Sequence, residues 1–291
     1  MAIDRKNVES IAYRYDRHRA GLQYFIGLSS WSHHPLQQEL AREVGKELGE
    51  EDGVIGFDPS GFKKCGTESV GVQRQWLGRL GKVDNGQVGV YMSYASRQEY
   101  TLIDARLYLP KSWAHDKKRR KKCGVPKEVC YQTRQELALD MLQSNRGLLP
   151  HQWITGDDEM GRSSGFRRDL RGFGEPYLLA VPSDTGIRDL ESAPPAYCGR
   201  GAPAKQPFMR VDRWRTLLDE RDWTRVNVRD GEKGPLVTEI AKRGVLARTE
   251  RGKEGGTEEL LVVTRTLESN GTMQYDYYLS NAPKETIGAR G

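Results

Sequence analysis

The chain has 291 residues, about two domain lengths, of which 36% are hydrophobic and 30% are charged, and its net charge is +6. No stretch approaches the roughly 18 apolar residues of a membrane-spanning helix, and the N-terminal MAIDRKNVES lacks the apolar segment of a signal peptide, so we expect an intracellular protein with no membrane partner. Four scattered cysteines match no common zinc spacing, which favours reduced thiols over a structural metal site.

Residues 1–50 are predicted to form an N-terminal helical region. The segment PLQQELAREVGKEL places Leu36, Leu40, Val44 and Leu48 four residues apart, so one apolar stripe runs along a helix whose other positions are mostly polar. This stripe predicts a packing face without a catalytic role.

Residues 51–186 change to a pattern of alternating strands and helices. Two β-rich runs are separated by a short turn, which predicts a hairpin. Thr133 and Glu136 stand at capping-box spacing at the start of a helix. This order predicts a mixed α/β sheet with helices packed on it. The predicted strands are 54–58, 87–96, 99–110, 152–158 and 177–182, and the predicted helices are 133–145 and 163–173.

A stretch rich in Pro, Gly and Ala separates this region from the rest of the chain. We interpret residues 187–209 as a linker, because ESAPPAYCGRGAPAKQPF combines many residues that favour loops. Residues 210–282 return to β-rich runs such as WTRVNVRDG and EELLVVTRTLE, which predict a second, mostly antiparallel unit. Residues 283–291 form a short tail.

Acidic residues follow two of the predicted strands. Asp58 ends the apolar run VIGFD, and Asp157 and Asp158 end the strand in ITGDDEMG. Functional groups gather at strand ends in an open sheet, so two neighbouring strands would bring Asp58 and Asp157 together. Adjacent carboxylates repel unless a cation lies between them, and their oxygens suit Mg²⁺ or Mn²⁺. The pattern therefore predicts metal anchors for an in-line phosphoryl displacement.

The acids at 58 and 157 and the glycines at 61 and 66 also allow interpretations other than a metal site. An Asp at a strand-to-turn junction commonly caps the turn, so either acid alone is more often structural. Gly61 and Gly66 have the spacing of a phosphate-binding P-loop, but Thr67 stands where that motif requires a lysine. Paired carboxylates also serve glycosidases, although that chemistry gives no reason for the basic residues.

The basic residues are concentrated in three blocks. The densest is KSWAHDKKRRKK at 111–122, and the others lie at 62–64 and 165–174. Such surfaces attract polyphosphates through counterion release. A basic run considered alone is more often a solvated face.

Long segments of the chain resemble a known family. GVIGFDPSGFKKCGTESVGVQRQWLGRLGKVDNGQVGVYMSY, WITGDDEMGRSSGFRRDLRGFGEPYLLAVPSDT, RVNVRDGEKGPLV and YDYYLSNAP look like bacterial insertion-sequence transposases with a DDE-type, RNase H-like core. The similarity covers nearly the whole chain. In that family the first acid lies on the first core strand and corresponds to Asp58. The second precedes an aromatic residue and Gly in a D-x-x-Y-G pattern, which matches Asp157 to Gly161 with Met160 in place of the Tyr.

The resemblance implies an RNase H-like catalytic core at 51–186 and a β-rich insertion domain at 210–282. It also implies two Mg²⁺ or Mn²⁺ ions held by Asp58, Asp157 and the neighbouring Asp158. Water then nicks the transposon end, and the freed 3′-hydroxyl attacks target DNA. The implied partners are double-stranded DNA, as transposon ends and target, and further copies of the chain on that DNA. The implied location is the bacterial cytoplasm, at the nucleoid.

Candidates for contacts with DNA follow from charge and position. The candidates for phosphate contacts are Lys63, Lys64, Arg119, Arg120, Arg167 and Arg168. Trp214 and Trp223 offer rings on which a splayed base can stack. Core packing is the more common role of such tryptophans, and apolar runs surround Trp223.

The chain departs from the family pattern after YYLSNAP. The family's third acid is a Glu on a helix that follows the insertion domain, with Tyr, Arg and Lys beside it. Residues 284–291 read KETIGARG, which is too short and too rich in Gly for that helix, and Glu285 lacks the family's combined pattern of Tyr, Arg and Lys around it. We therefore expect a truncated or frameshifted transposase with impaired cleavage. The alternative is a non-catalytic DNA-binding remnant that modulates the full-length enzyme.

Overall fold

The fold is taken from a computed structural model of the chain, which divides into two compact units at Leu40 and Ala41. Of the predicted linker and tail, residues 197, 198, 200–204 and 287–291 lie outside the described residues. The structure describes residues 7–29, 31–196, 199, 205–231, 234–249, 256–268 and 270–286, with the backbone alone at 228–231 and 234–236.

The N-terminal region is helical, as predicted. Its helices are α1 (Val8–Arg14), α2 (Arg19–Gly27) and α3 (His34–Glu47). Along the predicted apolar stripe, Val44 is buried and Leu48 packs against the core of the second unit, whereas Leu36 and Leu40 are exposed. Only the C-terminal half of the stripe is therefore a packing face of the second unit.

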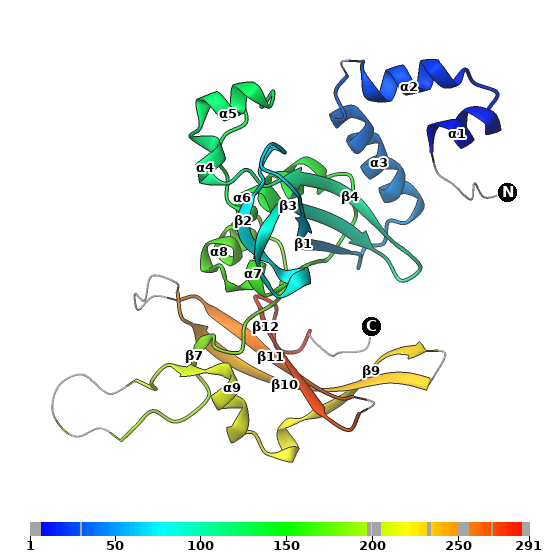
Figure 1. Ribbon diagram of the computed structural model, residues 1–291. Helices are drawn as coiled ribbons and strands as arrows, with labels where there is room; N and C mark the ends of the chain where they lie inside the picture. The colour runs from blue at the N-terminus through cyan, green and yellow to red at the C-terminus, as the bar shows by residue number, and fades with distance from the viewer. Residues whose placement is uncertain are drawn as a thin grey trace. The chain divides into compact units, whose positions relative to one another are not determined.

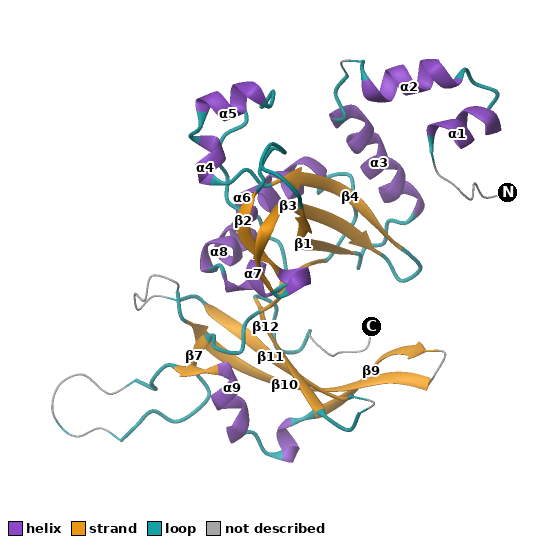
Figure 2. Ribbon diagram, in the orientation of Figure 1, coloured by secondary structure: helices purple, strands orange, loops and turns teal. Residues whose placement is uncertain are grey.

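The second unit begins with a mixed sheet flanked by helices (Figure 1; Figure 2). Its strands are β1 (Val54–Lys63), β2 (Gln73–Leu77), β3 (Lys82–Ala95), β4 (Tyr100–Leu107), β5 (Trp153–Gly156) and β6 (Tyr177–Ala180), and its helices are α6 (Arg134–Asn145), α7 (Asp158–Arg162) and α8 (Ser164–Gly172). Strand β1 is antiparallel to β3 and parallel to β5, and β6 is parallel to β5. The predicted hairpin is confirmed as β3 and β4, and the capping box of Thr133 and Glu136 is confirmed at α6.

Strand β1 is longer than predicted. The prediction that it ends at Asp58 is wrong, because β1 continues to Lys63 and pairs with β3 along its whole length. Strand β5 pairs with β1 only as far as Phe57, so from Asp58 onward no strand of the described residues pairs with that edge of β1. Proline lacks an N–H donor and is tolerated at such an edge, which accounts for Pro59 within the strand. The pairing with β5 therefore stops just before Asp58, whereas β1 itself continues beyond this residue.

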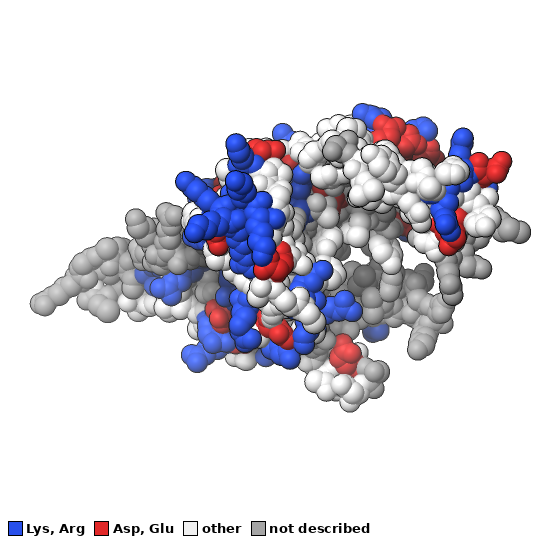
Figure 3. Space-filling view, turned by 45° about the horizontal axis from the view of Figure 1, so that its top comes forward, with Lys and Arg blue, Asp and Glu red and all other residues white. Residues whose placement is uncertain are grey.

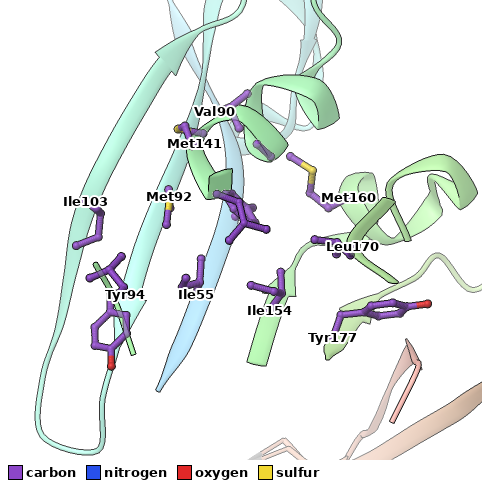
Figure 4. Close-up of a cluster of buried hydrophobic side chains, with 14 of the residues drawn as sticks. Ile55, Val90, Met92, Tyr94, Ile103, Met141, Ile154, Met160, Leu170 and Tyr177 are labelled. Carbon is purple, nitrogen blue, oxygen red and sulfur yellow. The ribbon is translucent and has the colours of Figure 1, made fainter. Parts of the chain in front are cut away.

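Apolar side chains of the sheet and of the helices α3, α6, α7 and α8 form the core of this region (Figure 4). Ile55 of β1 and Ile154 of β5 are fully buried, as are Met141 of α6 and Leu170 of α8. Burying one such side chain contributes roughly 1.5–3 kcal/mol. The helices α6, α7 and α8 are thereby fixed against the strands that carry the acids.

Antiparallel strands of the C-terminal part continue the sheet. They are β7 (Gly186–Asp189), β8 (Met209–Arg210), β9 (Thr224–Gly231), β10 (Gly234–Ala247), β11 (Glu258–Leu267) and β12 (Met273–Ser280), with helix α9 (Val211–Trp214). Strand β12 pairs with β6, and β11, β10 and β7 follow in that order. The predicted β-rich, antiparallel character of this part is confirmed. The stretch interpreted as a linker includes most of β7 and the first residue of β8, which are too short for a recognisable alternation.

Short helices complete the described chain. They are α4 (Lys111–Ala114), α5 (Lys117–Lys122) and the 3₁₀ helices η1 (Gly78–Leu80), η2 (Arg215–Leu217) and η3 (Glu220–Asp222). Trp113 of α4 is fully buried in a small cluster with Val72 and Leu109. Across the described ranges, no helix has both the length and the apolar character that crossing a membrane requires.

Candidate active site

The register of two parallel strands brings Asp58 and Asp157 to one edge of the sheet. Strands β1 and β5 pair from Val54 opposite Trp153 to Phe57 opposite Gly156, and the two acids are the next residues of each strand. Neighbouring strands lie about 4.8 Å apart. Residues separated by about a hundred positions in the sequence thus become direct neighbours, which is the arrangement on which the predicted metal site depends.

Asp157 is a half-buried carboxylate at the start of α7. It is the N-cap residue, and its Oδ1 accepts a hydrogen bond from the Met160 N–H at 3.1 Å. Burial raises the pKa of Asp157 to about 6, and the negative charges of Glu159, Asp158 and Asp58 add to this effect, whereas the Met160 hydrogen bond opposes it. The carboxylate of Asp157 therefore lies among three other acidic side chains.

A close backbone contact fixes the helix that Asp157 begins. A Cβ atom at Gly161 would lie 1.8 Å from the carbonyl oxygen of Ala180 in β6, so any other residue would force α7 away from the sheet. The family pattern places a glycine here, and the structure gives the physical reason. The contact holds the start of α7, and with it Asp157, against the strand edge.

Asp58 is exposed on the same edge. Its Oδ2 accepts a hydrogen bond from the Ser60 hydroxyl at 3.3 Å. Within the described ranges, no Lys, Arg or His lies within 4.0 Å of the carboxylate oxygens of Asp58 or Asp157. Asp158, the third predicted ligand, is exposed on the first turn of α7.

Glu159, which follows Asp157 and Asp158, has its negative charge balanced by an arginine. The sequence did not single out this residue. Glu159 accepts hydrogen bonds from Nη1 of Arg134 at 2.8 and 2.6 Å, and its main-chain carbonyl accepts one from Gln135 at 3.1 Å. The Arg134 guanidinium also lies 5.0 Å from the ring centre of Tyr108. The start of α6 is thereby tied to α7. The run of three acids in GDDEMG was the available signal, but it does not show which acid has a cationic partner.

The donor set at this edge fits a hard divalent cation. Asp58 and Asp157 offer carboxylate oxygens, which Mg²⁺ and Mn²⁺ prefer. Burial, and to a smaller extent the neighbouring acids, raise the pKa of Asp157, and a bound cation would offset both effects by stabilising the charged carboxylate. The described residues contain no cluster of three or more His, Cys, Asp or Glu side chains that could hold a metal ion. Two neighbouring carboxylates are therefore the oxygen donors that the described part of the chain brings to this edge.

Two of the predicted phosphate contacts hold a basic segment in place. The Arg119 side chain donates to the carbonyl of Thr67, and its guanidinium lies 3.6 Å from the ring centre of Trp113. Arg120 donates to the carbonyls of Pro126 at 2.7 Å and Val129 at 2.6 Å. These arginines anchor α5 through main-chain acceptors.

Neighbouring lysines on α5 point to solvent. Lys117, Lys118 and Lys121 are exposed, and no ion pair to them is formed by the part of the chain that the structure describes, whereas Lys122 pairs with Glu68 at 2.6 Å. The largest cluster of basic side chains in Figure 3 lies at α5. On α5, the basic side chains that have neither a hydrogen-bond nor an ion-pair partner in the described chain are therefore these three lysines.

The other predicted phosphate contacts differ in their surroundings. Lys63 pairs with Asp84 at 3.3 Å, and Lys64 is exposed. Arg168 is exposed and pairs with Asp169 at 3.2 Å. Arg167 is buried, and its Nε donates to Glu259 of β11 at 2.9 Å. Of these four residues, Lys64 alone is both exposed and without an ion pair to another described residue.

The two tryptophans considered for base stacking pack into the second core. Trp214 is 4% exposed and donates from Nε1 to Asp189 at 2.9 Å. Trp223 packs against the same core, and the guanidinium of Arg265 lies 4.4 Å from its ring centre. Core packing, the more common role, accounts for both residues.

A comparison with protein-family models gives a match to this chain. A family model described as "DDE superfamily endonuclease" matches residues 1–235, which is more than half of the chain. A comparison with curated proteins found no match.

Proposed function

The chain belongs to the DDE superfamily endonuclease family, and from this premise we propose that it is a DNA transposase that cuts and joins strands at the ends of an insertion sequence. The observation that carries the proposal is the pairing of Asp58 and Asp157 at the β1–β5 edge without a cationic partner among the described residues. Nucleases of this superfamily generally use divalent metals, and this edge offers them oxygen donors.

In this proposal Asp58 and Asp157 hold the cation, with Asp158 as the adjacent donor. When bound, Mg²⁺ or Mn²⁺ supplies positive charge that stabilises the attacking and leaving oxygens of an in-line phosphoryl displacement. Other residues of the chain orient the carboxylate that would bind the cation. The Met160 N–H fixes the rotamer of Asp157, and the pair of Glu159 with Arg134 holds the first turn of α7.

The proposed DNA contacts begin with the exposed lysines of α5. Lys117, Lys118 and Lys121 have no ion-pair partner in the described chain and can each approach a phosphate, and Lys64 is exposed in the same way. Arg119 and Arg120 act in this proposal by holding α5 rather than by touching DNA. Transposon ends and target DNA as substrates, and assembly of several copies on DNA, belong to the same proposal.

Binding of DNA without cleavage is the second candidate function. It is supported by the donor count, because the described residues bring two carboxylates to this edge and no cluster of three. In this candidate the α5 lysines bind DNA and the acids have no catalytic role. We retain residues 51–186 as the proposed RNase H-like core, which is catalytic only in the first candidate, and 210–282 as the proposed insertion domain in both.

A cleavage assay separates the two candidates. The full chain is incubated with supercoiled DNA that carries the element's own ends, with Mg²⁺ or Mn²⁺, and nicked product is measured. We expect nicking by the wild type and a loss of more than about 100-fold in Asp58→Asn and Asp157→Asn, because each removes a ligand charge. Asp169→Asn, which changes a partly exposed carboxylate of α8 that pairs with Arg168, is the matched control. Undiminished nicking by both active-site variants would contradict the transposase proposal, and DNA binding without metal-dependent nicking would favour the second candidate.

A further inference from the structure

One face of β1, β2 and β3 points away from the core. Along β3 the even-numbered residues from Val88 to Tyr94 are buried, whereas odd-numbered residues such as Tyr91 and Val83 are more exposed. The register places Asp58 directly opposite Tyr91, so the first acid lies on this outward face. Cross-strand partners on one face have Cβ atoms about 5 Å apart. The open face therefore begins at the candidate active site.

Aromatic side chains extend this face away from Asp58. Phe62 is 43% exposed, and its ring contacts that of Tyr91 edge-on with 6.2 Å between centres. Trp76 of β2 is 56% exposed and pairs with Val83 of β3. Exposed rings of this size within strands are unusual where no partner covers them. From Val83 to Tyr91 the face is about 26 Å long at 3.3 Å per residue.

Gly89 makes room for the ring nearest to the acid. A Cβ at Gly89 would lie 2.8 Å from Oη of Tyr91 and 2.9 Å from two of its ring carbons, so the ring extends over this glycine. Tyr91 thus lies along the sheet rather than standing away from it. Its hydroxyl forms no hydrogen bond with any described residue, which leaves the polar end of the ring available.

The charges around the aromatic residues are mostly positive. Residues 59–87 contain five basic and two acidic side chains. Of the two acids, Glu68 pairs with Lys122 of α5, and Asp84 lies within 4.0 Å of both Lys63 and Lys82. The remaining basic residues of this segment are Lys64, Arg74 and Arg79, all exposed. Rings interleaved with uncompensated cations suit a strand of nucleic acid better than an apolar protein segment.

We propose that the face formed by Phe62, Trp76 and Tyr91 binds unpaired DNA by stacking its bases, and so holds a single strand that leads to the phosphate at Asp58 and Asp157. The inference rests on the proposed function, which places a scissile phosphate at that edge. Stacking on exposed rings of a sheet is tolerant of sequence, because every base has a π-face, and it selects unpaired over paired DNA. The face therefore adds a preference for a locally opened DNA end.

The test compares single-stranded with duplex DNA. The full chain is titrated in EDTA, which prevents cleavage, against a labelled strand of about 12 nucleotides and its duplex, within the site sizes of single-strand-binding folds. Fluorescence anisotropy gives both affinities, and 2-aminopurine in the strand reports stacking directly. The test variant is Phe62→Leu with Tyr91→Leu, which keeps apolar volume and removes the rings. Tyr91→Phe keeps the ring, and Tyr100→Leu removes an aromatic residue that is 82% exposed at the far end of β4.

We expect the double variant to bind the single strand about tenfold more weakly, with the duplex affinity unchanged and the 2-aminopurine quenching lost. Tyr91→Phe and Tyr100→Leu should behave as the wild type. Unchanged single-strand binding by the double variant overturns the inference, as does an equal loss for strand and duplex. If the double variant instead converts an oligomer to monomers in sedimentation with no change in strand binding, the face is a protein interface and the inference fails. Each of these failures leaves metal-dependent nicking, the test of the proposed function, unaffected.

Discussion

Two groups of charged side chains in the second unit differ in how their charge is compensated. At the β1–β5 edge, Asp58 and Asp157 lie side by side, and the described chain provides no cation for them. Between α8 and β11, Glu259 accepts from Nε of Arg167 at 2.9 Å and from the hydroxyl of Tyr177 at 2.5 Å, and both members of the ion pair are buried. The two carboxylates of the first group repel each other. In the second group, the charge of Glu259 is balanced by Arg167.

The contrast separates charges that hold two elements together from charges that have no partner in the described chain. A buried ion pair whose polar atoms form hydrogen bonds holds two elements together, and here it joins α8 to β11. Burial and the charge of Glu259 raise the pKa of Tyr177, so that its hydroxyl remains a donor to this carboxylate. Two adjacent carboxylates without such partners destabilise the fold and persist where a ligand supplies the missing charge.

The largest expected effect comes from breaking the compensated group. Arg167→Ala should lower the free energy of unfolding by about 3–5 kcal/mol, because Glu259 would stay buried without its cation. Urea denaturation measures the change. Arg168→Ala, which removes the neighbouring exposed pair with Asp169, should cost no more than about 1 kcal/mol. A loss below about 1 kcal/mol in Arg167→Ala would show that the pair is not structural.

A third group of charges, the exposed lysines of α5, is proposed to bind DNA phosphates. Replacing Lys117, Lys118 and Lys121 with Ala should weaken DNA binding and reduce the slope of log affinity against log salt by roughly 0.9 for each phosphate that is no longer neutralised. Titration of labelled duplex DNA at several salt concentrations measures this slope. Replacement of Lys46, an exposed lysine of α3 beside Glu43 and Glu47, is the matched control. An unchanged slope in the triple variant would show that α5 does not bind DNA phosphates.

Removing a charge from the uncompensated group should stabilise the protein. In EDTA at neutral pH, Asp157→Asn should raise the free energy of unfolding by about 1 kcal/mol, a modest value because solvent screens this partly exposed carboxylate. The amide oxygen of Asn still caps α7 by accepting from the Met160 N–H. Asp158→Asn, an exposed neighbour, should change stability little. Thermal or urea unfolding of both variants decides this, and a destabilised Asp157→Asn would contradict the charge argument.

The smallest expected effect is in the pH profile of stability. The pKa of Asp157 is about 6 in the folded chain and about 3.9 in the unfolded chain, so between these values the folded state binds more protons. Without divalent cations, the free energy of unfolding should therefore contain a component that falls as pH rises from about 4 to about 6. Subtracting the profile of Asp157→Asn isolates this component. Identical profiles for the two proteins would show that Asp157 titrates at its ordinary pKa.

The sequence predicted much of the candidate site and less of its surroundings. Asp58 and Asp157 were predicted to meet because apolar strands that end on acids align their ends in a mixed sheet, and the register bears out this geometry. The continuation of β1 past Pro59 was not predictable, because it depends on pairing with the distant strand β3 along the whole length of β1. Nor does the sequence KKRRKK show that Arg119 hydrogen-bonds a distant carbonyl while Lys118 does not, since the acceptors belong to loops whose positions follow from tertiary packing.

Calorimetric titration of Mn²⁺ into the full chain tests most directly whether Asp58 and Asp157 share a cation. The wild type should bind Mn²⁺, and Asp58→Asn and Asp157→Asn should each weaken the affinity by at least about tenfold, with little further loss when both are combined, because the two side chains form one site. If either single variant binds Mn²⁺ as tightly as the wild type, the two carboxylates do not form a common metal site.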